Sequence, residues 1–150
     1  MENKWVISPM TLEDFNQIAP VLKIEFDDFW NEHILKEELQ NKNSHYYVAK
    51  QGDKIVGFAG IWKAVDDVHI TNIVVRKSER QHGIGSALLE HLIEEGKKMK
   101  DIQSITLEVS EKNKAAIGLY TKYGFQNLGI RKNYYNIGEN AIIMTHYYHK

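Results

Sequence analysis

Residues 69–75 and 80–85 read His-Ile-Thr-Asn-Ile-Val-Val and Arg-Gln-His-Gly-Ile-Gly, and a helical pattern follows them directly. The apolar run predicts a strand, and the two glycines predict a turn into a helix that starts near Gly85. The first amide N–H groups of a helix have no partner within it, and the helix dipole favours negative charge there. The stretch therefore predicts a site for a phosphate or diphosphate group.

Two common phosphate-binding motifs do not fit this turn. A Walker loop would continue with Gly-Lys-Ser/Thr, but Gly85 is followed by Ser86 and Ala87. A dinucleotide fingerprint would have a third small residue where Leu88 stands. Taken alone, the turn is equally well explained as an ordinary strand-to-helix connection that contains glycines.

Three blocks of sequence together resemble the GNAT family of N-acetyltransferases. The first is Arg-x-x-Gly-x-Gly after a strand, which is similar to the acyl-CoA loop of that family. The second block lies downstream and consists of Leu107-Glu108-Val109, Asn113, Ala116, Leu119-Tyr120 and Gly124-Phe125. The third resembles the end of the bacterial ribosomal-protein-alanine N-acetyltransferases and consists of Arg131-Lys132-Asn133-Tyr134-Tyr135 and Glu139-Asn140-Ala141-Ile142-Ile143-Met144. The resemblance covers about Thr71 to Met144.

The length and composition indicate one globular domain. A chain of 150 residues fits a single domain, 1–150, that buries about two thirds of its unfolded surface. Hydrophobic residues make up 43% and charged residues 26%, which is ordinary for a soluble protein. No apolar run is long enough for a membrane span, and residues 1–4 lack the apolar core of a signal peptide. A cytoplasmic protein without membrane contact is the expectation.

The residue types present exclude several kinds of site. Cysteine is absent, which excludes disulfides, zinc–thiolate sites and a cysteine nucleophile. The seven histidines are scattered without metal-ligand spacing, so no metal is expected. A net charge of −1 gives no broad attraction for nucleic acid, so no direct nucleic-acid partner is expected.

The patterning predicts an α/β (α+β) fold without linker or repeat. Four helices are expected: one capped by Thr11, then 34–40, one from Gly85, and 113–123. Strands are expected at 5–8, 46–49, 55–62, 69–75, 104–110, 125–130 and 141–147. The resemblance implies the same order, with a mixed, mostly antiparallel sheet that is splayed between its fourth and fifth strands.

Glu108 and Tyr120 are the candidate catalytic residues. Thr106, Glu108 and Ser110 alternate with apolar neighbours, which places Glu108 mid-strand on the face opposite the apolar one. The resemblance implies that Glu108 takes the amine proton and that Tyr120 gives a proton to the thiolate. A solvated or lysine-paired Glu108 and a core-packing Tyr120 are the alternatives.

The resemblance implies acetyl-CoA as co-substrate. The main chain of Ile73, Val74 and Val75 would bind the pantetheine arm as an added strand does. The diphosphate would lie on the loop Arg80, Gln81, His82, Gly83, Ile84, Gly85 and Ser86, and Asn113 would contact the coenzyme. An exposed Arg80 is also commonly just solvated, and Asn113 is a favoured helix cap.

The resemblance also implies an acceptor groove lined by Glu25, Tyr134 and Tyr135, with the tyrosines in the loop between the last two strands. Packing explains these tyrosines equally well. The first loop, Phe26–Trp30, departs from the family pattern, and Asn140 stands where an acid is customary. Both departures fall on the acceptor side.

The expected function is acetyl transfer to the N-terminal α-amine of a protein, with a ribosomal protein as the implied partner. An α-amine has a pKa of about 7.7–8.0 and lysine about 10.4, so a carboxylate base suits the former. A small-molecule amine acetyltransferase, for polyamines or an antibiotic, is one alternative. A non-catalytic acyl-CoA-binding module is another. A monomer or weak homodimer is expected.

Overall fold

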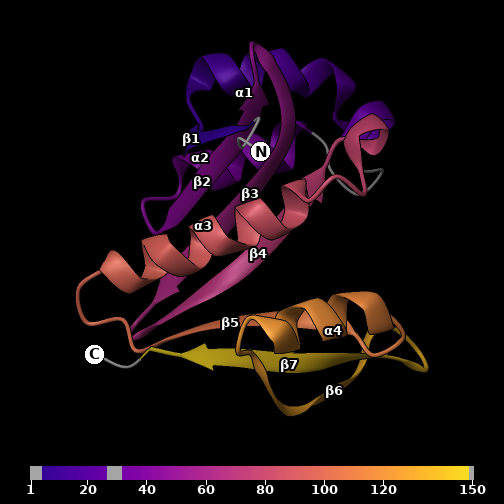
Figure 1. Cartoon of the computed structure of the whole chain (residues 1–150). Helices are drawn as coiled ribbons and strands as arrows, with labels where there is room; N and C mark the ends of the chain where they lie inside the picture. Colours follow the sequence, from indigo (N-terminus) through magenta and orange to yellow (C-terminus); the bar gives the residue numbers. More distant parts are fainter. Residues whose placement is uncertain (1–4, 27–31, 149–150) are drawn as a thin grey trace. The chain divides into compact units, whose positions relative to one another are not determined.

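The computed structural model describes residues 5–26 and 32–148. Figure 1 shows its elements, which in chain order are β1 (Val6–Pro9), α1 (Leu12–Ile18), η1 (Ala19–Val21), η2 (Leu22–Phe26), α2 (Glu32–Gln40), β2 (Ser44–Gln51), β3 (Lys54–Ala64), β4 (Asp67–Val75), η3 (Lys77–Glu79), α3 (Ile84–Lys98), β5 (Ser104–Ser110), α4 (Lys114–Lys122), β6 (Gln126–Asn136) and β7 (Glu139–Tyr147). η1 and η3 are 3₁₀ helices, and η2 is a single π-helical turn.

The chain forms two compact units. The first comprises Met1–Trp62 and Thr71–Ile93, and the second comprises Lys63–Ile70 and Glu94–Lys150. Because the division falls within β4 and within α3, these two elements contribute residues to both units.

The sheet has the strand order β1-β2-β3-β4-β5-β7-β6. β1 pairs antiparallel with β2, β2 with β3, β5 with β7, and β6 with β7. β4 and β5 are parallel and pair only from Asp67 opposite Ser104 to His69 opposite Thr106. The predicted mixed, mostly antiparallel sheet with four α-helices is confirmed, and the pairing of its fourth and fifth strands ends after three positions, as a splay requires.

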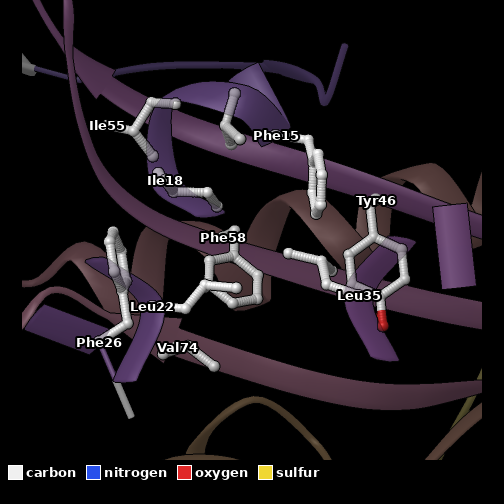
Figure 2. Packing of buried hydrophobic residues seen from close by; sticks show 10 residues of the cluster. Phe15, Ile18, Leu22, Phe26, Leu35, Tyr46, Ile55, Phe58 and Val74 are labelled. Atoms are coloured by element: carbon white, nitrogen blue, oxygen red, sulfur yellow. The ribbon is translucent and has the colours of Figure 1, made fainter. Parts of the chain in front are cut away.

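Ten buried side chains from the helices and strands of the first unit pack into one hydrophobic cluster (Figure 2). Phe15, Ile18 and Leu22 recur at three- and four-residue spacing, so they share one face of the helical segment. The Phe26 ring lies 5.6 Å from the Phe58 ring and anchors the end of η2. The rest of the cluster comprises Leu35, Tyr46, Val48, Ile55 and Val74. Each fully buried large side chain contributes about 1.5–3 kcal/mol.

A reciprocal cap begins α1, as predicted at Thr11. The Asp14 amide donates to the Thr11 hydroxyl oxygen at 3.1 Å, and the Thr11 amide donates to the Asp14 carboxylate at 2.9 Å. Lys50 on β2 pairs with the same carboxylate at 2.8 Å. Burial acts to raise the pKa of Asp14, but the hydrogen bonds from Lys50 and Thr11 leave that pKa lowered overall.

In the second unit, β5 alternates as predicted. Ile105, Leu107 and Val109 are buried, while the residues between them are partly exposed. α4 is held by Phe125, whose ring lies 5.9 Å from Tyr120 and 5.6 Å from His146 on β7. Among the described residues, no helix has both the length and the apolar composition needed to cross a membrane.

The predicted elements are present, but one boundary is wrong in a way that matters for function. β6 was expected to end at Ile130 and instead reaches Asn136, so Tyr134 and Tyr135 lie in a strand rather than in a loop. The register shifts after Arg131, and pairing resumes at Asn136 opposite Glu139. This stretch is exposed, so it lacks the apolar alternation that reveals a strand in sequence.

Candidate functional site

The predicted phosphate loop lies in the first unit, between η3 and α3. Gly83 has a φ of +89°, a left-handed conformation that side chains rarely adopt, and Gln81 shares this region at 68°. α3 begins at Ile84, so the amides of residues 84–86 have no acceptor within the helix. The Ile84 side chain is buried in the core, which leaves only its main chain for a ligand. Gln81 and His82 are exposed and Ser86 is half-buried.

The two glycines of the loop serve different purposes. A Cβ on Gly83 would meet only Trp5, at 3.7 Å, so its backbone conformation rather than crowding requires glycine. A Cβ on Gly85 would meet Val75 at an ordinary 3.7 Å, so nothing within the fold requires glycine there. Close approach of a ligand to the backbone remains the predicted reason for Gly85.

Arg80 is engaged with main-chain oxygens. Its Nε donates to the Val75 carbonyl at 3.0 Å, and its Nη2 donates to the Phe26 carbonyl at 2.7 Å. The side chain therefore ties the end of η2 to the end of β4. Its predicted contact with coenzyme phosphate stays a prediction.

The strand predicted to bind pantetheine, Ile73 to Val75, has its central side chain in the core, since Val74 belongs to the cluster of Figure 2. Just before it, the Asn72 amide donates to the Tyr46 hydroxyl at 2.8 Å. Burial, followed by smaller effects of neighbours that include Glu38, raises the pKa of Tyr46 to about 12. A Cβ on Gly60 would lie 2.5 Å from the Tyr46 ring, so glycine at 60 makes room for this ring.

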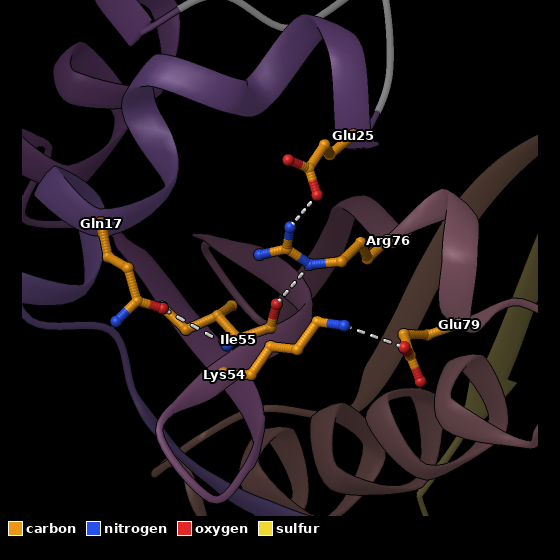
Figure 3. A network of polar contacts seen from close by, with 6 residues as sticks. All are labelled: Gln17, Glu25, Lys54, Ile55, Arg76 and Glu79. Atoms are coloured by element: carbon orange, nitrogen blue, oxygen red, sulfur yellow. Dashed lines mark hydrogen bonds and ion pairs between the residues drawn. The ribbon is translucent and has the colours of Figure 1, made fainter.

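Glu25 belongs to a polar network around a buried arginine (Figure 3). Arg76 donates its Nε to the Ile55 carbonyl at 2.9 Å and a terminal nitrogen to Glu25. Its guanidinium also lies 4.7 Å from the centre of the Phe26 ring. The Arg76 side chain is 9% exposed and that of Glu25 43% exposed. Glu25 therefore balances a buried charge, whatever contact it makes with an acceptor.

Glu108 lies mid-strand on β5 in the second unit, between two basic side chains. Its Oε2 is 2.6 Å from Nη1 of Arg131, and its Oε1 is 3.5 Å from Nε2 of His69. The Glu108 side chain is only 9% exposed, while that of Arg131 is 57% exposed. Among the described residues, no cluster of three or more histidine and acidic side chains could hold a metal ion.

Tyr134 and Tyr135 are near this carboxylate, although both are exposed. Their rings meet edge to face at 4.9 Å, and the Arg131 guanidinium lies 4.8 Å from the Tyr134 ring centre. Burial and then the Glu108 carboxylate raise the pKa of Tyr134. For Tyr135, burial is again the main cause of a raised pKa, followed by Tyr134, Glu108 and Tyr120. The second unit thus gathers the candidate base, the candidate acid and both tyrosines.

Tyr120 and Asn113 are on α4. Burial raises the pKa of Tyr120, so its hydroxyl is protonated at neutral pH, as a proton donor must be. Tyr120 also packs on Phe125, so the packing role is present as well. The Asn113 side chain accepts from the Ala116 amide at 3.1 Å, which makes it the cap of α4.

The sequence reasoning did not assign a role to Arg76, His69 or Arg131. His69 on β4 pairs with Thr106 on β5, and Thr106 lies two positions before Glu108 on the same face of that strand. The contact between His69 and Glu108 could therefore be predicted only with knowledge of this register. Arg131 reaches Glu108 from a different strand, so no spacing along the chain signals the contact. The departure at Phe26–Trp30 falls, after Phe26, outside the described residues.

Asn140, the second departure on the acceptor side, supports the hairpin. Its side-chain oxygen accepts from the Asn133 amide at 2.8 Å. Asn133 has a φ of 54°, and its own side chain accepts from the Gly138 amide at 2.7 Å. These bonds hold the irregular part of β6 that carries the two tyrosines.

Comparison with known proteins gives the family. The model of the acetyltransferase (GNAT) family matches residues 13–125. A Bacillus subtilis protein, provisionally named as a ribosomal protein bS18-alanine N-acetyltransferase, is 37% identical over 146 residues, which is 96% of each chain. The crystal structure of the ribosomal-protein-S18-alanine N-acetyltransferase from Escherichia coli has a TM-score of 0.83 and 32% identity, covering 95% of this chain and 93% of that one.

A GNAT family acetyltransferase from Elizabethkingia anophelis, solved with acetyl-CoA bound, shares the fold, with a TM-score of 0.73 and 23% identity over 98% of this chain and all of that one. The family model spans well over half of the 150 residues, and the Bacillus subtilis relative is similar over nearly the whole length. This chain therefore belongs to the acetyltransferase (GNAT) family.

Proposed function

We propose that this chain transfers the acetyl group of acetyl-CoA to the N-terminal α-amine of a ribosomal protein. The relatives named for that activity support the proposal, since one is 37% identical over 96% of this chain. The observation that carries it is the Glu108 carboxylate, which is shielded from solvent on β5 and shares its surroundings with Tyr120, Tyr134 and Tyr135.

The reaction needs a neutral amine and a protonated leaving group. The amine nitrogen attacks the thioester carbonyl carbon, the C–N bond forms, the C–S bond breaks, and the thiolate of CoA departs. Glu108 takes the amine proton, directly or through water, and Tyr120 gives its hydroxyl proton to the thiolate. An α-amine with a pKa of about 7.7–8.0 makes the first proton transfer a modest one.

The coenzyme would be held by groups of the first unit. The free amides at residues 84–86, the left-handed turn at Gly83 and the dipole of α3 suit a diphosphate. Residues 1–150 would form one catalytic domain. The protein would work in the cytoplasm as a monomer or weak homodimer, without metal, membrane or nucleic acid.

A small-molecule amine acetyltransferase is the second candidate. The observation in its favour is that both departures from the family pattern, at Phe26–Trp30 and at Asn140, fall on the acceptor side. A third candidate, an acyl-CoA-binding module without catalysis, would bind the coenzyme and form no product.

An acceptor panel tests these candidates. Purified protein and acetyl-CoA are incubated with peptides that begin with Ala, Ser or Met, and separately with polyamines and aminoglycosides, and acetylation is followed by mass spectrometry. We expect acetylated N-termini on peptides and no product from the free amines. Glu108→Gln and Tyr120→Phe are each expected to lower kcat by about 10²-fold or more while the Kd for acetyl-CoA is unchanged. Acetylation of free amines alone would assign the second candidate instead.

A further inference from the structure

Among the described residues, the cationic side chain within normal hydrogen-bond distance of the Glu108 carboxylate is Arg131. Its Nη1 lies 2.6 Å from Oε2, whereas Nε2 of His69 lies 3.5 Å from Oε1. In the part of the chain that the structure describes, the hydroxyl of Tyr134, which hydrogen-bonds to the carboxylate, and the hydroxyl of Tyr135 also lie beside it, both on the same strand as Arg131. Oε2 of Glu108 is therefore held by Arg131, whereas Oε1 has the longer contact, to His69.

Contacts other than the one to the Glu108 carboxylate also hold Arg131 in place. Its guanidinium lies 4.8 Å from the centre of the Tyr134 ring, three residues further along β6. Between these residues the strand leaves its register with β7, and the left-handed Asn133 is fixed by Asn140 and Gly138. The hairpin thus presents Arg131 to β5 although its side chain is largely exposed.

A charge-assisted hydrogen bond fixes the orientation of a carboxylate more firmly than a neutral one does. The 2.6 Å contact from Arg131 engages Oε2 of Glu108, whose side chain is only 9% exposed. Oε1, with its longer contact to His69, is left to receive the proton of the acceptor amine.

We propose that Arg131 is a positioning residue for Glu108: it holds one oxygen of the carboxylate and so presents the other to the acceptor amine. This inference rests on the proposed function, because it needs Glu108 to act as the base. Arg131 does not itself exchange a proton in this scheme. It acts only through Glu108.

A double-mutant cycle on the full chain tests the inference, with acetylation of an alanine-start peptide as the readout. Arg131→Met is expected to lower kcat by about 10-fold or more, with the Kd for acetyl-CoA unchanged, since Met keeps the length and loses the charge. Arg131→Lys is expected to recover part of that loss, because the ammonium keeps the charge and loses the planar contact with Tyr134. Lys132→Met, at the neighbouring exposed position, is the matched control and is expected to leave kcat unchanged.

The decisive comparison is made in the Glu108→Gln background. There Arg131→Met is expected to have no further effect, because the group it acts through is already lost. Equal losses in the two backgrounds, or an Arg131→Met protein with the parental kcat, would overturn the inference and leave the proposed function intact. If the proposed function itself were wrong, the parental protein would acetylate no peptide, or Glu108→Gln would retain full kcat.

Discussion

Two arginine–glutamate pairs, Arg76–Glu25 in the first unit and Arg131–Glu108 in the second, have opposite burial. In the first pair the arginine is buried and the carboxylate half-exposed, whereas in the second the carboxylate is buried and the arginine exposed. A guanidinium cannot lose its proton near neutral pH, but a carboxylate can gain one. The first pair is therefore a permanent part of the fold. The buried member of the second is a carboxylate, the kind of group that can act as a base.

The largest effect on the free energy of unfolding is expected when the exposed member of the first pair is replaced, and the second pair gives the comparison. Glu25→Gln leaves Arg76 buried without a counter-charge, and we expect it to lower the free energy of unfolding by about 2–3 kcal/mol, less than for a fully buried pair because Glu25 is half-exposed. Arg131→Met is expected to lower the free energy of unfolding less, since His69 remains beside Glu108. Urea unfolding at neutral pH measures both.

A double variant separates the lost counter-charge from lost packing. Arg76→Met combined with Glu25→Leu removes both charges and keeps the side-chain volume, and it is expected to regain most of the stability that Glu25→Gln loses. If Arg131→Met were as destabilising as Glu25→Gln, the contrast between the two pairs would be wrong.

The same contrast explains what the sequence could and could not predict. The turn at Gly83, the cap at Thr11 and the alternation around Glu108 are local patterns, and the structure confirms each of them. The two arginine pairs join residues that are 51 and 23 positions apart, so they depend on strand register rather than on local pattern. The end of β6 escaped prediction because exposed strands carry no apolar signal.

A smaller effect is expected at high pH, again from a buried group of the first unit. The pKa of Tyr46 is raised to about 12, so its neutral hydroxyl is favoured by folding. This stabilisation is complete below the unfolded pKa of about 10, is lost as the pH rises towards 12, and is on the order of 2 kcal/mol. We expect the free energy of unfolding to fall between pH 9 and about 11.5, and to fall less in Tyr46→Phe, as measured by urea unfolding.

Tyr134→Phe is the matched variant from the second unit. Tyr134 is exposed, and its pKa is raised mainly by partial burial and the nearby Glu108 carboxylate. Tyr134→Phe is expected to show most of the fall in the free energy of unfolding that the parent shows at high pH. If the free energy of unfolding fell as much at high pH in Tyr46→Phe as in the parent, Tyr46 would not be the group responsible.

The smallest effects are expected at the two helix caps, one in each unit. Thr11 takes part in a reciprocal cap with Asp14, whereas Asn113 accepts one exposed hydrogen bond from Ala116. We expect Thr11→Ala to cost about 1 kcal/mol of unfolding free energy and Asn113→Ala about half as much. Thermal unfolding of the two variants beside the parent measures the difference.

Asn113→Asp then distinguishes capping from the predicted coenzyme contact. An aspartate keeps the oxygen that accepts from Ala116, so stability is expected to be retained, but it lacks the amide N–H groups and adds a negative charge. If Asn113 contacts the coenzyme, calorimetry will show a several-fold weaker Kd for acetyl-CoA in a variant as stable as the parent. An unchanged Kd would assign Asn113 to capping alone, and the coenzyme would then depend on main-chain groups of the first unit.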